Sequence, residues 1–220
     1  MTNSGELDDL ATESVDPRYA DIDRLSVAEL ASLMNEADAQ VPAAVRRALP
    51  QIVPAIEAVV ERMRRGGRLI YIGAGTSGRL GILDASEIPP TFSAAPGQVQ
   101  AIIAGGRQAT WAAVEGAEDD ADAGAAAMDA AGVGPLDSVL GLASSGRTPF
   151  VLAGVRRAGA LGALTIGLSC NAGTALSAAV DHAIEVIVGP EVVSGSTRLK
   201  AGTAQKLVLN MISTIAMVQL

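Results

Sequence analysis

The sequence predicts an α/β protein in which a parallel, doubly wound sheet of five strands carries helices on both faces. Two observations predict this fold. Short apolar runs recur along the chain, at 69–72, 99–103, 138–142, 164–168 and 184–188. Helical patterns lie between them, at 77–84, 108–131, 149–158 and 175–180. Apolar strands that alternate with helices are typical of a parallel sheet whose two faces are both covered.

A helical segment is predicted before the first strand. Ser26 and Glu29 have the spacing of a capping box, so a helix is expected at 27–38. A second helical pattern covers 41–65, and its two internal prolines, at 50 and 54, are expected to kink or restart that helix.

The chain divides into three parts on this basis. We expect a loose, polar arm at 1–16, N-terminal helices at 17–66 and the α/β domain at 67–220, which closes with a helix at 199–220. An apolar face without a stop signal at the end of that last helix favours a homodimer.

Composition excludes several classes of protein. The net charge of −8 argues against nucleic acid as a main partner. A single cysteine, Cys170, excludes an internal disulfide, and a single histidine, His182, excludes a site with several histidines; we expect no metal. No apolar run is long enough to span a membrane and no signal-peptide pattern opens the chain, so we expect a cytoplasmic protein.

The turn after the first strand predicts an anion site. Glycines at 73, 75 and 78 surround Thr76 and Ser77, and a helical pattern follows. Backbone N–H groups at a helix start carry partial positive charge, glycines let the backbone approach a ligand, and hydroxyls add donors. The segment therefore has the features of a phosphate-binding loop.

Two other nucleotide-binding loops fit less well. A P-loop has lysine after its last glycine, where this chain has Arg79. The glycines match the dinucleotide fingerprint G-x-G-x-x-G, but that motif needs an acidic residue about 20 positions on, and Glu87 comes too early. A tight strand-to-helix turn without a ligand is the remaining alternative.

A second hydroxyl-rich loop follows the strand at 138–142. Ser144, Ser145 and Thr148 cluster around Gly146, directly before a helical pattern. A third cluster, at 194–200, precedes the last helix, and helix capping explains it equally well. Two such loops at the ends of parallel strands predict a small-ligand site with a phosphate held by N–H and O–H groups.

Several motifs together resemble one family with the sugar isomerase (SIS) fold, the N-acetylmuramic acid 6-phosphate etherases. They are Gly73-Ala-Gly-Thr-Ser-Gly-Arg-Leu-Gly81, Asp84-Ala-Ser-Glu-Ile-Pro-Pro-Thr91, Ile103-Ala-Gly-Gly106, Ala113-Val-Glu-Gly-Ala-Glu-Asp-Asp120, Ser144-Ser-Gly-Arg-Thr-Pro149 and Ser194-Gly-Ser-Thr-Arg-Leu-Lys-Ala-Gly-Thr-Ala-Gln-Lys206. The resemblance extends from about residue 18 to the end. The family continues into a small helical C-terminal domain, which we expect to be absent from this chain.

The resemblance implies a lyase of peptidoglycan recycling. It would convert N-acetylmuramate 6-phosphate and water into N-acetylglucosamine 6-phosphate and D-lactate, with no metal or organic cofactor. It would work as a homodimer with sites near the subunit interface. An aldose–ketose phosphosugar isomerase and a non-catalytic sugar-phosphate sensor, like the regulatory protein of glucokinase, are the alternatives on the same fold.

The resemblance also implies which residues act. The family's catalytic glutamates fall on Glu87, expected to protonate the leaving lactate and then activate water, and on Glu118, the expected base at C2. Glu115 competes for the second role because it lies three residues earlier on the same predicted helix. We expect the substrate phosphate and sugar to be bound by Thr76, Ser77, Ser144, Ser145, Thr148 and Lys200.

Overall fold

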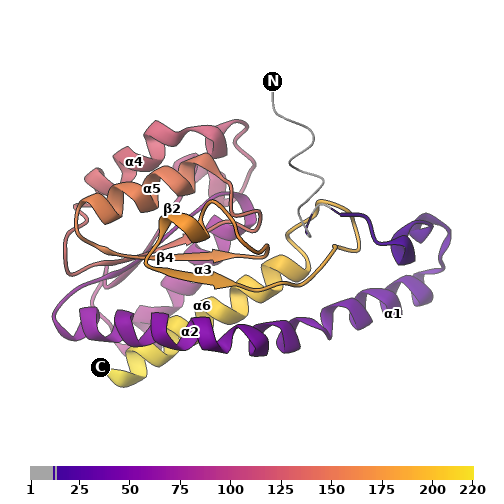
Figure 1. The fold of residues 1–220 in the computed structure, drawn as a ribbon, viewed down its shortest axis with the longest axis horizontal. Coiled ribbons are helices and arrows are strands. Elements are labelled where there is room, and N and C mark those ends of the chain that lie inside the picture. Colours follow the sequence, from indigo (N-terminus) through magenta and orange to yellow (C-terminus); the bar gives the residue numbers. More distant parts are fainter. Residues whose placement is uncertain (1–11, 13) are drawn as a thin grey trace.

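The computed structural model describes residue 12 and residues 14–220, and it has one sheet between two helical layers (Figure 1). The strands are all parallel and lie in the order β2-β1-β3-β4-β5. The predicted fold is therefore confirmed. The strands are β1 (Leu69–Gly73), β2 (Val99–Ile103), β3 (Ser138–Leu142), β4 (Leu164–Ser169) and β5 (His182–Glu185). Of the arm expected at 1–16, residues 1–11 and 13 lie outside the described residues.

Successive side chains of each strand point to opposite faces, and this alternation builds two cores. Leu69 and Tyr71 belong to a core with α2, α3 and α6, whereas Ile70 and Ile72 belong to a core with α4 and α5. Figure 1 shows α4 and α5 on one side of the strands and α2 and α6 on the other. The helices are α1 (Val27–Asp38), α2 (Val41–Arg64), α3 (Gly75–Phe92), α4 (Ala121–Ala130), α5 (Pro149–Ala160) and α6 (Lys200–Gln219).

The N-terminal helices follow the expected pattern, except at the prolines. The capping box before α1 is present: the N–H of Glu29 donates to Ser26 Oγ at 3.3 Å, and the N–H of Ser26 donates to Glu29 Oε2 at 2.8 Å. The expected restart of α2 at Pro50 or Pro54 is wrong, because the helix runs through both. Both prolines lie on its exposed face, where water can solvate the carbonyl groups that lose a donor.

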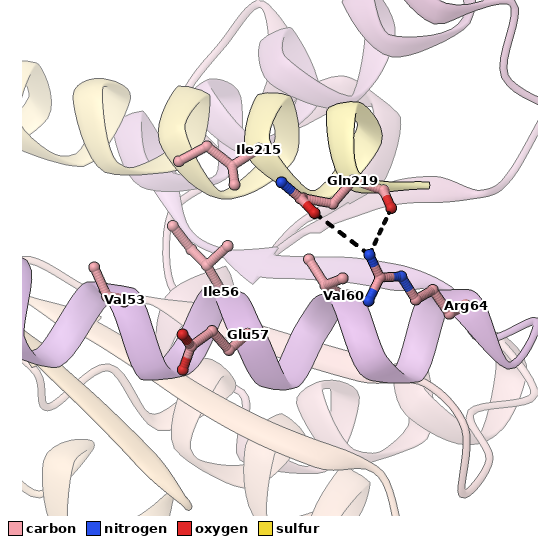
Figure 2. Close-up of a pocket in the computed structure, with 7 residues that line it drawn as sticks. All are labelled: Val53, Ile56, Glu57, Val60, Arg64, Ile215 and Gln219. Atoms are coloured by element: carbon pink, nitrogen blue, oxygen red, sulfur yellow. Dashed lines mark hydrogen bonds between the residues drawn. The ribbon is translucent and has the colours of Figure 1, made fainter.

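Helix α2 packs along α6, and this contact leaves a shallow groove (Figure 2). Ile56 and Val60 of α2 face Ile215 of α6 across it. At one end, Arg64 Nη2 donates to the backbone oxygen of Gln219 at 2.9 Å. The groove lies in the outer helical layer, whereas ligands of open α/β sheets bind at the carboxyl ends of the strands.

Four predicted elements differ from those observed. The helix expected at 77–84 begins two residues earlier and continues to Phe92, through Pro89 and Pro90. Ile88 and Phe92 pack in the core below the sheet, and this packing holds the last turn although two N–H donors are missing. Glu87 therefore lies within a helix.

The helix expected at 108–131 is wrong over its first half. Gly116 has a φ of 71°, a left-handed conformation that interrupts a helix. The segment instead forms two short 3-10 turns, Gly106–Thr110 and Ala117–Asp119, before α4 begins. Glu118 thus stands on a turn.

Two elements near the last strand are also shorter or shifted. Strand β5 starts two residues before the expected run and stops at Glu185, because its partner β4 ends at the paired Ser169. The helix expected at 175–180 is only a 3-10 turn at Ser177–Ala179. There, Thr174 Oγ1 accepts the N–H of Ser177 at 3.1 Å, a local bond that competes with helix formation.

A buried carboxylate ties three elements together beneath the sheet. Asp84 of α3 accepts hydrogen bonds from the hydroxyl of Tyr71 at 2.7 Å, from Asn210 Nδ2 at 2.8 Å and from Ser213 Oγ at 3.1 Å. This network joins α3 to β1 and α6. Burial raises the pKa of Tyr71 well above its usual range, and the nearby Asp84 carboxylate adds to the effect, so the phenol stays protonated and remains a donor.

The strand order places the ligand site. In the order β2-β1-β3-β4-β5, the chain passes from β1 to β2 on one side of β1, and from β2 it crosses back to β3 on the other side of β1. Open α/β sheets bind ligands at such a switch point, outside the carboxyl ends of the strands. The two hydroxyl-rich loops that the sequence singled out follow β1 and β3. Over the described part of the chain, no helix combines the length and apolar character needed to cross a membrane.

Candidate functional site

A cavity of about 230 Å³ lies at the carboxyl ends of β1 and β3. Both hydroxyl-rich loops line it, and so does the turn that carries Glu118. The side chains with a hydroxyl around this cavity, hereafter the hydroxyl cavity, are Thr76, Ser77, Ser144, Ser145, Thr148 and Thr197. The structure thus brings together five of the six residues expected to bind the substrate.

The start of α3 explains why the first loop suits an anion. Ala74, the N-cap residue, makes no side-chain capping bond, so the first N–H groups of α3 are open towards the cavity. The glycine spacing has a packing cause: a Cβ at Gly73 would lie 2.7 Å from the nitrogen of Gly78, and one at Gly78 would lie 2.6 Å from Ile103 Cγ1. The strand end and the helix start therefore approach closely only with glycine at both positions.

The second loop is held by contacts from other elements. The backbone oxygen of Ser144 accepts the N–H of Cys170 and Asn171 Nδ2, both at 2.9 Å. Thr148 is the N-cap of α5 and makes no side-chain capping bond. Thr148 lines the cavity, and its hydroxyl is not used to cap the helix, so it is available to a ligand.

Glu118 is the single charged side chain among the described residues that line the hydroxyl cavity. It also borders a second cavity, of about 360 Å³, together with Glu115 and Arg79. The two cavities share Ala74, Gly75 and Glu118, so they are adjacent. A phosphate in the hydroxyl cavity would be held by neutral donors, with one carboxylate close by and no cation among the described lining residues.

Glu87 lies apart from this site within one chain. It is exposed on α3 and lines neither cavity. It follows Ser77 by ten residues, which corresponds to about 15 Å along the helix axis. The two expected catalytic carboxylates therefore do not converge within a single copy of the chain, whereas Glu115 and Glu118 border the same cavity.

Lys200 also lies outside the hydroxyl cavity. Its side chain is buried, and Nζ donates to the backbone oxygen of Val188 at 2.9 Å. Glu191 lies beside it and accepts the N–H groups of Lys200 and Ala201, at 3.0 and 2.9 Å, so it caps α6. Burial lowers the pKa of Lys200, and burial also raises the pKa of Glu191 despite these bonds. In this chain Lys200 thus orders the loop before α6.

Thr197 also lines the hydroxyl cavity, although it was not among the residues expected to bind the substrate. It belongs to the hydroxyl cluster at 194–200, for which capping was an equal alternative. Its backbone oxygen does accept the N–H of Gly202 at 2.9 Å, near the start of α6. Thr197 lines the cavity nonetheless. The hydroxyl cluster is visible in the sequence, but only the fold shows that Thr197, among its hydroxyl residues, lines the cavity.

Family models match most of the chain. The N-terminal SIS domain of glucokinase regulatory protein matches residues 51–158, and the SIS domain matches residues 118–215. A phosphoheptose isomerase from Francisella tularensis has the same fold, with a TM-score of 0.68 and 23% identity over 87% of this chain and 98% of that one. The NanR protein of Vibrio vulnificus, solved in complex with ManNAc-6P, has a TM-score of 0.56 at 16% identity, over 86% of this chain and 64% of its own.

A curated relative from Rubrobacter xylanophilus is much more similar in sequence. It is named N-acetylmuramic acid 6-phosphate etherase and is 59% identical over 97% of this chain and 71% of its own length. Relatives with the same name from other bacteria are 52% to 57% identical. Sequence identity of this degree over nearly the whole chain, together with the SIS fold and its two hydroxyl loops, places the chain in the N-acetylmuramic acid 6-phosphate etherase family.

Proposed function

We propose that this chain is a carbon–oxygen lyase of peptidoglycan recycling, which cleaves the D-lactyl ether of N-acetylmuramate 6-phosphate. The products are N-acetylglucosamine 6-phosphate and D-lactate. The observation that carries the proposal is the 59% identity to a relative of that name, extending over both hydroxyl loops and the turn with Glu118. The adjoining position of these three segments supports it.

The substrate's 6-phosphate is proposed to occupy the hydroxyl cavity. Thr76 and Ser77 lie at the start of α3, and Ser144, Ser145 and Thr148 lie before α5. Both helices direct their N-terminal N–H groups to the carboxyl edge of the sheet, where a phosphate is favoured by hydrogen bonds and by the helix dipoles. Lys200 would support this site indirectly, through the loop that carries Thr197.

The chemistry requires a base and an acid. In the open-chain sugar, the C2–H bond is acidified by the C1 aldehyde next to it. A base removes this proton, lactate leaves from C3 with a proton from an acid, and water then adds to the alkene at C3. We propose Glu118 as the base at C2, because it stands between the hydroxyl cavity and the adjacent cavity. Two carboxyl groups in distinct environments can act as the base at C2 and as the acid at the C3 oxygen.

We further propose that Glu87 reaches the substrate from a second copy of the chain in a homodimer. A proton donor must be within hydrogen-bond reach of the C3 oxygen, and about 15 Å along α3 is longer than a hexose. Glu87 is exposed on α3 and free to enter a neighbouring site. Glu115 is the alternative acid within the same chain. The homodimer and the cytoplasmic location remain predictions.

An isotope experiment tests the reaction. The protein is incubated with N-acetylmuramate 6-phosphate in water enriched in heavy oxygen, and lactate and labelled N-acetylglucosamine 6-phosphate are measured. Elimination followed by hydration places the label at C3. A ketose product would indicate an isomerase, and tight binding without turnover would indicate a sensor; either result contradicts the proposal.

Mixed dimers test where Glu87 acts. Glu87→Gln and Glu118→Gln are each expected to remove turnover, while phosphosugar affinity in Glu87→Gln stays within about tenfold because the phosphate contacts remain. If the two residues come from different copies, a mixed dimer has one intact site, and equal mixing restores about a quarter of wild-type activity. If they act within one copy, mixing restores nothing. Glu115→Gln, mixed in the same way, tests the alternative acid.

A further inference from the structure

Gln205 of α6 lies directly behind the second hydroxyl loop. Its side chain is fully buried, and Nε2 donates to Ser144 Oγ at 3.1 Å. Its Oε1 has no hydrogen-bond partner among the described residues. A buried amide oxygen without a partner is costly and uncommon, so its retention calls for a reason beyond packing.

The contact with Gln205 determines what Ser144 offers to a ligand. A serine hydroxyl has one proton to donate and lone pairs to accept with. Because Ser144 Oγ accepts from Gln205, its own proton is free to point into the hydroxyl cavity, which Ser144 lines. If the amide were turned over, Ser144 would donate to Gln205 and present only lone pairs to the cavity, and a phosphate would be repelled.

We propose that Gln205 is a positioning residue that fixes Ser144 as a hydrogen-bond donor to the substrate's phosphate. This inference rests on the proposed function, because it takes the hydroxyl cavity as the phosphate site. With phosphate bound, the bonds from Gln205 to Ser144 and from Ser144 to the phosphate run in the same direction, and each polarises and strengthens the other. Gln205 acts through Ser144 and does not touch the reacting atoms.

Two substitutions distinguish reversing the hydrogen bond between Gln205 and Ser144 from removing it. In Gln205→Glu, the ionised carboxylate can only accept from Ser144. In Gln205→Met, neither donor nor acceptor remains, and the Ser144 proton stays free. We expect the Kd for inorganic phosphate and for N-acetylglucosamine 6-phosphate to rise about 30-fold in Gln205→Glu and about threefold in Gln205→Met. Calorimetry measures both, without any need for turnover.

The pH dependence and a double variant identify the mechanism. The new carboxyl donates when protonated, so the loss of affinity relative to wild type should grow as the pH rises from about 5 to about 8. In a Ser144→Ala background, adding Gln205→Glu should raise the Kd for phosphate by less than about threefold, because the residue through which Gln205 acts is gone. Gln219→Glu, on the exposed end of the same helix (Figure 2), is the matched control and should leave affinity unchanged.

The outcomes are distinct. Equal phosphate affinity in wild type and Gln205→Glu at every pH would overturn the proposal, as would an undiminished effect in the Ser144→Ala background. Thermal unfolding of each variant checks that it folds. If Gln205→Glu does not fold, the other two variants test the proposal instead: an unchanged Kd for phosphate in both Gln205→Met and Ser144→Ala would overturn it. If no lactate is released by the wild type while the affinities change as expected, the proposed reaction fails and the role of Gln205 stands. In an active enzyme, KM should rise with kcat nearly constant.

Discussion

Arg79 of α3 holds the segment at 109–112, which leads into the turn that carries Glu118, and its removal should slow catalysis without unfolding the protein. Its Nε donates to the backbone oxygens of Ala109, at 3.0 Å, and Thr110, at 3.2 Å, and Nη2 donates to that of Ala112 at 3.2 Å. These three carbonyl groups lie in the segment just before the Glu118 turn. The perturbation is Arg79→Met, which keeps most of the side-chain volume and removes the donors.

The magnitude follows from these contacts. Two N–H groups are involved, because Nε is shared between two acceptors. Hydrogen bonds from a charged donor contribute about 1.5–3 kcal/mol each, and the lower half of that range applies here because the guanidinium is partly exposed and water can replace it. Two donors at about 1.5 kcal/mol each would cost the ordered turn about 3 kcal/mol relative to its open states. Since only the ordered turn presents Glu118, we expect kcat to fall by up to about 150-fold.

The assay combines steady-state kinetics with hydrogen exchange. In Arg79→Met, amide protons at 106–119 should exchange faster, kcat should fall and the Kd for phosphate should change by less than about threefold, because the hydroxyl loops are untouched. Arg107→Met, an exposed arginine of the same segment, is the matched control. If Arg79→Met leaves amide exchange and kcat at the level of Arg107→Met, Arg79 does not order this segment.

Three further predictions concern stability and binding. Asp84→Ala leaves the Tyr71 hydroxyl and Asn210 Nδ2 without their acceptor, while Ser213 Oγ keeps the backbone oxygen of Leu209. The free energy of unfolding should fall by about 3–5 kcal/mol in Asp84→Ala and by about 1–2 kcal/mol in Tyr71→Phe; urea unfolding measures both, and equal losses would contradict the network. Burial alone would raise the pKa of Asp137, but hydrogen bonds from Arg68 and from backbone N–H groups hold that pKa below its usual value. Its stabilising contribution is therefore complete above about pH 4 and is lost as the pH falls through the lowered pKa, and Asp137→Asn should flatten this acid branch of the stability curve. Thr197→Val should raise KM about tenfold at constant kcat, while Thr203→Val, a neighbouring exposed threonine, should not; the same KM in both variants would remove Thr197 from the phosphate site.

Several local elements and the chemistry of the loops could be predicted from the residues alone. Strands β2 and β3 match their predicted bounds, since each is a short, mostly apolar run. Helix α1 matches as well, because its start depends on the capping box at Ser26. The hydroxyls at 76, 77, 144, 145 and 148 were found because a strand that ends in a turn before a helix is a local pattern, and parallel strands bring such turns to one edge.

Only the tertiary structure decided what depends on distant partners. Helix α3 continues through Pro89 and Pro90 because packing on the core outweighs the local cost of proline, and Glu87 is carried away from the cavity as a result. Lys200 is buried against a carbonyl group of the preceding loop, which its position beside the hydroxyl cluster does not reveal. Gln205 lies behind Ser144 because α6 crosses beneath the sheet, 61 residues later in the chain. Periodicity and capping are properties of neighbouring residues, whereas convergence on a site is set by strand order and helix packing.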